Sequence, residues 1–368
     1  MRMAWRDDPR GRGSAAFRGV RASTPVEHID AAVHPERLAD GGFWVVVATF
    51  EGRMDAWRFA DVDRGSGVRE PLEAARPWDG PERSLWETSL DEARYMVGVD
   101  AIKADIREGD VYQVNLCRVL RAPMPSASPG PDAVALSHVL SRGNPARHAA
   151  RIVIPESSEM PGAWIVSASP ELYLSVKGDR LSSSPIKGTA APGQSMLDKD
   201  EAENVMIADL IRNDLSHVAV PGSVAVPELL GVHEHPGLVH LQSTVTARLA
   251  PAFDWTPTMW GALFDGTFPP GSVSGAPKAS ALQIIAREEP VVRGPYCGAI
   301  GWIDADSRTA ELAVGIRTFW WNDEAGGTLR FGTGAGITWG SEPAAEWEET
   351  QLKARRLIDL ASTDTMGT

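Results

Sequence analysis

Charged side chains recur at regular spacing near the C-terminus, where the sequence predicts a helix over about 344–362. Glu346, Glu349 and Lys353 lie three and four residues apart, so a helix places them on one face. The segment GTGAGITWGSEP comes directly before this helix. Amides of a glycine turn and of a helix N-terminus attract anions, and a few carboxylates suit Mg²⁺, which keeps waters and takes ligands from its substrate. The pattern indicates a site for Mg²⁺ and an anion; a solvated charged stripe is the alternative.

A second charged helix is expected from Asp198 through EAENVMIADLIRNDL. Its apolar residues cover much of the circumference, so some of its polar side chains must be buried and paired: Glu203, Asp209, Arg212, Asn213 and Asp214. An ion-pair network around Arg212 would explain Asp209 and Asp214. Glu203 lies well away from that arginine and is the residue that such a network explains least.

Three further positions have side chains suited to catalysis or anion binding. GSVSGAPK (271–278) is a loop with glycines, hydroxyls and a lysine that opens a helix near Pro277, but it lacks P-loop spacing; a tight turn is the alternative. Lys187 follows a strand in SSSPIKGTAAPG, where an isolated surface lysine is the alternative. His240 alternates with apolar residues in LVHLQSTV, which also fits a hydrogen-bonded strand histidine. The sequence has no nucleophile elbow and no HExxH motif.

Strands and helices must position these groups. FWVVVATF (43–50) predicts a buried strand, and the capping-box pattern of Ser89 and Glu92 predicts a helix that Gly109 ends. Several short β-type runs follow between 151 and 184, and CGAIGWID, ELAVGIRTFWW and TLRFGTG predict strands before the last helix. Strand clusters with interspersed helices, rather than alternating βαβ units, indicate an α+β fold.

Length and composition limit the class of protein. A chain of 368 residues, 43% apolar and 23% charged, predicts one large globular domain or two interlocked halves. The net charge of −13 argues against nucleic acid or an anionic membrane surface as the main partner. The longest apolar run is too short to span a membrane, and no signal peptide is evident. Cys117 and Cys297 cannot form a disulfide framework or a cysteine zinc site, so a cytoplasmic enzyme is expected.

Together, these motifs resemble those of the chorismate-utilising enzymes, the family of anthranilate synthase and aminodeoxychorismate synthase component I. The matching segments occur in the family's order over about 85–360: GDVYQVNL, SPELYL, PIKGT, AENVMIADLIRNDL, VHLQSTV, GSVSGAPK, RGPYCGAIGW, VGIRT and GAGITWGSEPAAEWEE. The resemblance implies an α+β fold with two β-sheets packed as a sandwich flanked by helices, and a site in the cleft between the halves. It also implies a catalytic domain over 85–362, with 1–84 as a shortened N-terminal region that contributes to the sandwich.

The resemblance implies catalytic roles for the charged residues at motif positions. Glu203 and Glu349 match the Mg²⁺ ligands, with Glu346 nearby. Lys187 matches the lysine of aminodeoxychorismate synthases, whereas anthranilate synthases usually have alanine there. Its neutral amine would add to C2 of chorismate while the C4 hydroxyl departs, and ammonia entering at C4 would then displace the lysine. Glu171 matches the general acid, whose pKa would have to be raised to keep its proton near neutrality.

Other matched residues are expected to surround the substrate. His240 and Ser272 match positions that line the ring and its leaving hydroxyl, and His240 is the third catalytic candidate. The implied substrate-binding set is Ser272, Tyr296, Arg317, Gly334, Ala335 and Gly336. Within it, Tyr296 and Arg317 would hold a carboxylate. Arginine and amide donors suit a dianion, and Mg²⁺ offsets the remaining charge.

The sequence therefore predicts aminodeoxychorismate synthase component I, which makes 4-amino-4-deoxychorismate from chorismate and ammonia, on the way to p-aminobenzoate and folate. No glutaminase nucleophile is visible, so a glutamine amidotransferase subunit is expected to supply ammonia. Alternatives within the family are anthranilate synthase component I and isochorismate or salicylate synthase; outside it, a non-catalytic metabolite-binding protein. Departures from the family pattern at Cys117, Pro270 and Gly340 remove no chemical role.

Overall fold

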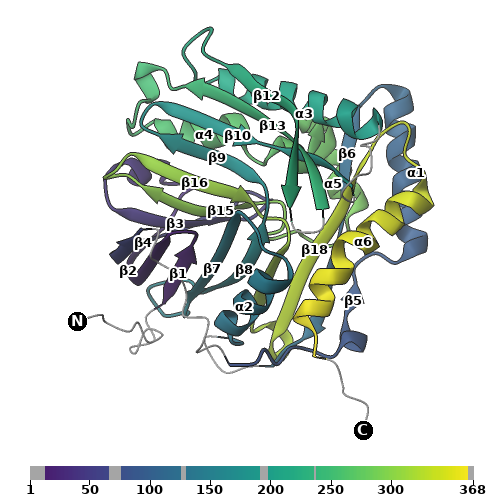
Figure 1. The fold of residues 1–368 in the computed structure, drawn as a ribbon, viewed down its shortest axis with the longest axis horizontal. Helices are drawn as coiled ribbons and strands as arrows, with labels where there is room; N and C mark the ends of the chain where they lie inside the picture. The colour runs from purple at the N-terminus through teal and green to yellow at the C-terminus, as the bar shows by residue number, and fades with distance from the viewer. Residues whose placement is uncertain (1–12, 66–75, 126–129, 191–197, 236–237, 364–368) are drawn as a thin grey trace.

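The computed structural model describes residues 13–65, 76–125, 130–190, 198–235 and 238–363. In these ranges eighteen strands and six α-helices follow one another along the chain (Figure 1). Clustered antiparallel strands with interspersed helices make this an α+β fold, as the sequence predicts. Among the described residues, no helix combines the length and the apolar character that crossing a membrane requires.

All of the described strands belong to one antiparallel sheet. Its first half runs through β12 (Ala225–His235), β13 (Leu238–Arg248), β10 (Arg180–Ser184), β9 (Leu172–Lys177), β16 (Thr309–Val314), β15 (Ala299–Asp304), β3 (Phe43–Ala48), β4 (Met54–Arg64) and β2 (Val20–Asp30). Its second half continues through β1 (Ser14–Phe17), β7 (His148–Ile154), β8 (Ala163–Ser169), β17 (Thr318–Asn322), β18 (Thr328–Ile337) and β6 (Gln113–Pro123). Short strands lie beside these: β11 (Ile186–Ala190) on β13, and β14 (Gly275–Ala276) and β5 (Glu87–Thr88) on β6.

This continuous pairing corrects the expectation of two separate packed sheets. Backbone pairing passes from β4 through β2 and β1 to β7. Strand twist and bulges, such as the register shift between Pro25 and Glu27, curl a long sheet. The sequence reveals the strands themselves, but which strands pair depends on contacts between distant segments.

The described residues form six α-helices: α1 (Glu92–Glu108), α2 (Ala133–Gly143), α3 (Asp198–Ser216), α4 (Met259–Thr267), α5 (Lys278–Glu288) and α6 (Pro343–Ala361). All except α4 pack directly on strands of the sheet, whereas α4 packs mainly on α3 and on the turn at Pro35–Ala39. Helix α3 packs on β11, β12 and β13 at one end of the sheet. Helix α6 packs on β18 near the other end and on α1 (Figure 1). A contact between Gln113 of β6 and Glu203 of α3 shows that the two ends come together. The two charged helices expected from the sequence thus belong to opposite ends of one curled sheet.

Helix α1 begins later than the capping-box pattern predicts. Asp91 caps it by accepting a hydrogen bond from the N–H of Arg94, whereas Ser89 accepts one from the N–H of Val119 in β6. Gly109 ends the helix as expected, with a φ of 87° that glycine adopts without strain. The serine therefore joins the helix entry to the strand beside it instead of capping.

Strands of the N-terminal region belong to the same sheet as the rest of the chain. The predicted buried strand is β3, whose six residues are all buried and pair with both β4 and β15. The division of the chain between 84 and 85 stays a prediction.

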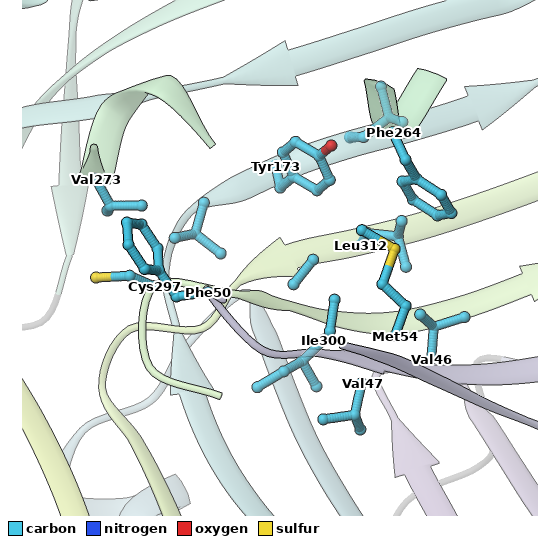
Figure 2. Packing of buried hydrophobic residues seen from close by; sticks show 14 of the residues in the cluster. Val46, Val47, Phe50, Met54, Tyr173, Phe264, Val273, Cys297, Ile300 and Leu312 are labelled. Atoms are coloured by element: carbon cyan, nitrogen blue, oxygen red, sulfur yellow. The ribbon is translucent and has the colours of Figure 1, made fainter. Parts of the chain in front are cut away.

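One part of the core supports the loop at 271–273. Figure 2 shows this core: Val273 of the loop lies beside Phe50 and Cys297, and the packing continues away from the loop through Leu312 and Phe264. Removing apolar surface from water stabilises such contacts by about 25 cal/mol per Å². The loop of GSVSGAPK is therefore part of the packed interior, and its residues 271–273 are all buried.

Candidate active site

Glu171 lies in the turn between β8 and β9 and is only 3% exposed. Its N–H donates to Oγ of Ser169 (3.3 Å), and its carbonyl accepts from the N–H of Val314 (3.1 Å). Both backbone bonds hold the turn against its neighbours. The SPE motif thereby fixes a carboxyl group in the interior.

Burial dominates the electrostatics of Glu171 and raises its pKa from 4.5 to about 7. Ser272 and the backbone N–H of Ile186 donate hydrogen bonds to the carboxylate and lower the pKa in part. Lys187 and Lys353 act in the same direction through their charges. Glu171 therefore holds its proton at a pH close to neutral, which is the property that a general acid needs.

Lys187 points inward from β11. Its side chain is 12% exposed, and its Nζ lies 4.0 Å from Oε2 of Glu203. The next residue, Gly188, has a φ of 75° and lies where the pairing of β11 with β13 is irregular. Bulges of this kind redirect side chains beside active sites. The alternative of an isolated surface lysine is excluded.

Asn204 anchors helix α3 to strand β13. Its side chain donates to the carbonyl of Leu241 (3.1 Å) and accepts from Oγ of Ser243. Leu241 lies directly opposite Lys187 in the pairing of β11 with β13. The hydrogen bonds of Asn204 therefore hold the adjacent residue, Glu203, near the amine of Lys187.

The glycine-rich segment before α6 is a strand, and the expected glycine turn is wrong for this part. Three glycines alternate on one face of β18: Gly332, Gly334 and Gly336. A Cβ on them would overlap, in turn, the side chains of Tyr296, Cys117 and Gln113. A Cβ on Gly336 would also lie 3.3 Å from Oε2 of Glu203. Glycine is required here because side chains lie directly on the backbone, whereas the turn comes later, at residues 338–341.

The same stretch of β18 has an open edge. It pairs with β6 on one side, and among the described strands none pairs with its other side beyond Phe331. Lys353 donates to the carbonyl of Gly334 (3.1 Å). Unpaired strand edges offer backbone N–H and C=O groups to a ligand. Amide contacts from Gly334, Ala335 and Gly336 would therefore come from a strand edge.

Tyr296 and Arg317 lie on two segments that are hydrogen-bonded to each other, through Cys297 N to Gly315 O at 3.0 Å. The ring of Tyr296 is buried against Gly332, and burial raises the pKa of its hydroxyl well above the ordinary value. Arg317 has a φ of 51° at the break between β16 and β17, which the sequence predicted as one strand. Burial lowers the pKa of Arg317, and the charge of Glu171 opposes this effect.

The three charged residues of α6 have different environments. Glu346 is 2% exposed, whereas Glu349 is partly exposed and forms an ion pair with Lys353 at 2.6 Å. Because Lys353 also reaches Gly334, this pair is attached to the site and is not a freely solvated stripe.

The carboxylates suit Mg²⁺ by their chemistry but do not form a ready-made cage. Among the described residues, no group of three or more His, Cys, Asp or Glu side chains is placed to hold a metal ion. Mg²⁺ commonly binds one or two carboxylates and completes its octahedron with water and substrate oxygens. Glu203, which the glycine at 336 allows close to the strand, fits that pattern together with Glu349. The ligand set stays a prediction.

Two site residues need separate mention. The backbone of His240 lies on β13, but its side chain is outside the described residues, so its predicted role stays a prediction. Gln113 was missed as an individual residue, although it lies in the matched GDVYQVNL. It is 1% exposed, donates to Glu203 (3.4 Å) and has a buried Oε1 without a hydrogen-bond partner. An uncompensated acceptor is costly in a core, which points to a ligand donor at this position.

The charged residues of α3 pair partly as expected. Arg212 pairs with Asp209 at 2.6 Å on the surface. Asp214 instead pairs with Lys278 of GSVSGAPK at 2.9 Å, and Lys278 also donates to the carbonyl of Thr267. The lysine of that motif therefore anchors the loop to α3.

Two cavities differ in their relation to these residues. A cavity of about 20 Å³, room for about one water molecule, is lined by Glu171, Asp214 and Ser272 among others. A larger one, of about 800 Å³, lies between α4, α5 and the turn after β3, and none of the predicted site residues is in its lining. The predicted site residues therefore lie at the smaller cavity, and the larger volume of the other cavity does not mark the candidate active site.

Comparisons with known proteins agree with this geometry. The family described as "chorismate binding enzyme" matches residues 55–359. Aminodeoxychorismate synthase component 1 of Klebsiella aerogenes is 36% identical over 288 residues, covering 75% of this chain and 59% of the relative. Anthranilate synthase component 1 of Streptomyces coelicolor is 35% identical over 300 residues, covering 78% and 55%. This chain thus spans little more than half the length of those relatives.

A solved structure supports the fold. The menaquinone-specific isochorismate synthase of Escherichia coli superimposes with a TM-score of 0.73 at 18% identity, covering 95% of this chain and 88% of that one. With the family match over most of the sequence and curated relatives above 30% identity, the chain belongs to the chorismate binding enzyme family.

Proposed function

We propose that this protein is an aminodeoxychorismate synthase component I, which converts chorismate and ammonia to 4-amino-4-deoxychorismate and water. One observation carries the proposal: a lysine amine, from Lys187, lies inside the site 4.0 Å from Glu203. Its charge also reaches Glu171, a buried carboxyl group that keeps its proton close to neutral pH. A nucleophile and an acid in one enclosed site are what the substitution chemistry needs.

The chemistry divides into two displacements. The Lys187 amine forms a bond to C2 of chorismate while the C4–O bond breaks, and Glu171 gives its proton to the departing oxygen, which leaves as water. Ammonia then forms a bond at C4 while the C2–N bond to lysine breaks. The proton lost by the incoming nitrogen returns Glu171 to its starting state, so the enzyme is regenerated.

Several groups of the chain would bind and neutralise the two carboxylates of chorismate. Arg317 and the hydroxyl of Tyr296 would hold one carboxylate, assisted by backbone groups at the open edge of β18. Mg²⁺, held by Glu203 and Glu349 with Glu346 nearby, would neutralise the other carboxylate and orient the ring.

The ammonia source is proposed to be a separate subunit. The curated relatives carry names ending in "component 1", which implies at least one further component. A glutamine amidotransferase would supply ammonia inside such a complex. Free ammonium salt would replace this subunit in an assay.

Product identification tests the proposal. Purified protein is incubated with chorismate, MgCl₂ and ammonium salt, and the product is identified by NMR. We expect 4-amino-4-deoxychorismate. Anthranilate as the product would overturn the proposal in favour of anthranilate synthase. Isochorismate or salicylate without incorporated nitrogen would overturn it in favour of those synthases, and unreacted chorismate would favour a metabolite-binding protein.

A further inference from the structure

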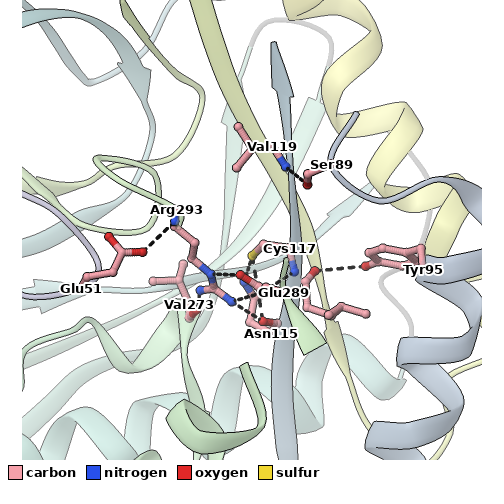
Figure 3. Close-up of polar contacts among 10 residues, drawn as sticks. Glu51, Ser89, Tyr95, Asn115, Cys117, Val119, Val273, Glu289 and Arg293 are labelled. Atoms are coloured by element: carbon pink, nitrogen blue, oxygen red, sulfur yellow. Dashed lines mark hydrogen bonds and ion pairs between the residues drawn. The ribbon is translucent and has the colours of Figure 1, made fainter. Parts of the chain in front are cut away.

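A buried arginine outside the predicted site residues joins segments that are far apart in the sequence. Arg293 is 1% exposed. Its guanidinium donates to the carbonyl of Val273 (2.9 Å), to the carbonyl of Asn115 (2.6 Å) and to both oxygens of Glu289 (2.8 and 2.5 Å) (Figure 3). One side chain thereby connects the loop at 271–273, strand β6 and the end of α5.

The partners of Arg293 are themselves fixed. Glu289 also accepts from the N–H of Cys117 in β6 (2.8 Å). The guanidinium lies 4.1 Å from the centre of the Phe50 ring. The backbone N–H of Arg293 donates to Glu51 in the turn after β3 (2.6 Å). Each guanidinium nitrogen of Arg293 therefore has a partner, although the residue also lines the larger cavity of about 800 Å³.

Two of these contacts lie next to the candidate active site. Val273 follows Ser272, which lines the cavity of about 20 Å³ together with Glu171 and whose hydrogen bonding lowers the pKa of that carboxyl group. Asn115 lies two residues from Gln113, whose amide donates to Glu203 (3.4 Å). In a strand, residues two apart share one face. Arg293 thus connects the loop next to the predicted general acid, Glu171, with the strand next to the predicted metal ligand, Glu203.

We propose that Arg293, neutralised by Glu289, is a positioning residue that holds the Ser272 loop against β6 and so keeps Ser272 beside Glu171 at the small cavity that both residues line. It does not touch the substrate. The proposal deepens the proposed function and rests on it for the identity of the reaction, but not for the placement of Ser272 itself.

The planar fork of arginine is needed for this role. It donates to two carbonyls and a carboxylate at fixed angles, which the single ammonium of lysine cannot reproduce. Lys278 holds the other end of the loop through Asp214 and the carbonyl of Thr267. Replacing Arg293 by lysine keeps the charge that Glu289 requires and releases one end of the loop only.

A loosened Ser272 has a signed effect on Glu171. The Ser272 hydrogen bond favours the charged carboxylate, so losing it raises the pKa of Glu171 further. The other charged groups facing Glu171 come from different elements: Lys187 of β11, Lys353 of α6 and Arg317 before β17. None of these groups contacts Arg293, so their effect on the pKa of Glu171 is expected to be the same in the wild type and in Arg293→Lys.

The test compares Arg293→Lys with Arg118→Lys. Arg118 is also buried (2% exposed) and lies over an aromatic ring, that of Trp347 at 4.4 Å, but its hydrogen bonds go to Thr88, Thr350 and Gln351, away from the loop. Chorismate consumption is measured from pH 5 to 9, which reports turnover whichever product forms. In a plot of kcat against pH, the alkaline limb is the decline on the high-pH side. We expect Arg293→Lys to shift this limb to a pH about one to two units higher, the equivalent of one hydrogen bond to a charged group. Arg118→Lys should leave the limb in place.

A double-mutant cycle with Ser272→Ala separates positioning from general loosening. Ser272→Ala should give the same upward movement, and the double variant should add nothing further, because both changes remove one hydrogen bond. An unmoved limb in Arg293→Lys, an equal movement in Arg118→Lys, or additive movements would each overturn the proposal. If Arg293→Lys does not fold, Glu51→Gln loosens the same residue from its backbone side; it should move the limb in the same direction, and an unmoved limb would overturn the proposal.

A readout without catalysis separates this proposal from the proposed function. The pKa of Glu171 can also be obtained from the pH dependence of the free energy of unfolding. For this, the wild type is compared with Glu171→Gln, and Arg293→Lys is compared with the double variant that also carries Glu171→Gln. A wild-type protein that leaves chorismate unreacted would overturn the proposed function. The unfolding measurements would then decide on Arg293 alone: a higher pKa in Arg293→Lys supports positioning, and an equal pKa rejects it.

Discussion

The buried carboxyl group of Glu171 should make the stability of the metal-free protein depend on pH. A pKa of about 7 in the folded protein, against the ordinary value of 4.5, corresponds to about 3 kcal/mol at about 1.4 kcal/mol per pKa unit. The side chain is 3% exposed, so screening by solvent reduces this little. Because the folded pKa is raised, the stabilisation is complete below pH 4.5 and is lost as the pH rises through 7.

Glu171→Gln isolates this contribution, since the amide has nearly the same shape and stays neutral at every pH. Urea unfolding of both proteins is measured between pH 4.5 and 8 in the presence of a chelator. The free energy of unfolding of the wild type, relative to the variant, should fall by about 3 kcal/mol over this range. A change below about 1 kcal/mol would refute the reasoning and remove the support for a protonated acid near neutrality.

Three other predictions concern the amine, the metal and the strand backbone. Lys187→Ala should lower amination by at least about 100-fold while circular dichroism stays unchanged; Lys177→Ala, on the exposed end of β9, is the control, and a wild-type rate in the first variant would remove the covalent role. Glu349→Gln should raise the Mg²⁺ concentration needed for half-maximal turnover, and an unchanged titration would count against its assignment as a ligand. Gly332→Ala should destabilise the fold by about 1–3 kcal/mol through overlap with a tyrosine ring. Gly340→Ala, with nothing near its Cβ position, should change stability by less than about 0.5 kcal/mol; equal urea midpoints for these two variants would contradict the packing argument.

Local sequence patterns predicted the helices well. The helix from Asp198 and the last helix are present, and Gly109 ends α1, because periodicity and terminators act over a few residues. The patterns failed where a distant segment decides the outcome. Ser89 bonds to a neighbouring strand instead of capping, and the run ELAVGIRTFWW breaks at Arg317 where the 295–298 segment pairs with Gly315.

The site followed the same rule. The motifs identified Lys187, Glu171 and Glu203, and the fold places these three side chains in one interior region. Gln113 and Arg293 lie in two of the matched segments, GDVYQVNL and RGPYCGAIGW, but their contacts are with residues far away in sequence, so the sequence did not single them out. The glycines of β18 looked like a turn, because glycine marks both sharp bends and close approach of side chains to a backbone.

The single curled sheet has a mechanical consequence for how the site can open. The two halves of the sheet carry residues on opposite sides of the candidate active site, Lys187 on β11 and Gly336 on β18, yet both halves belong to one hydrogen-bonded set of strands, joined through β2 and β1. Among the described strands, the backbone pairing between the two halves is unbroken, so one half cannot slide past the other. Any opening must therefore bend the array elastically, with small changes of twist spread over many strands. Substitutions in β1 or β2, far from the chemistry, are then expected to alter how stiffly the enzyme closes.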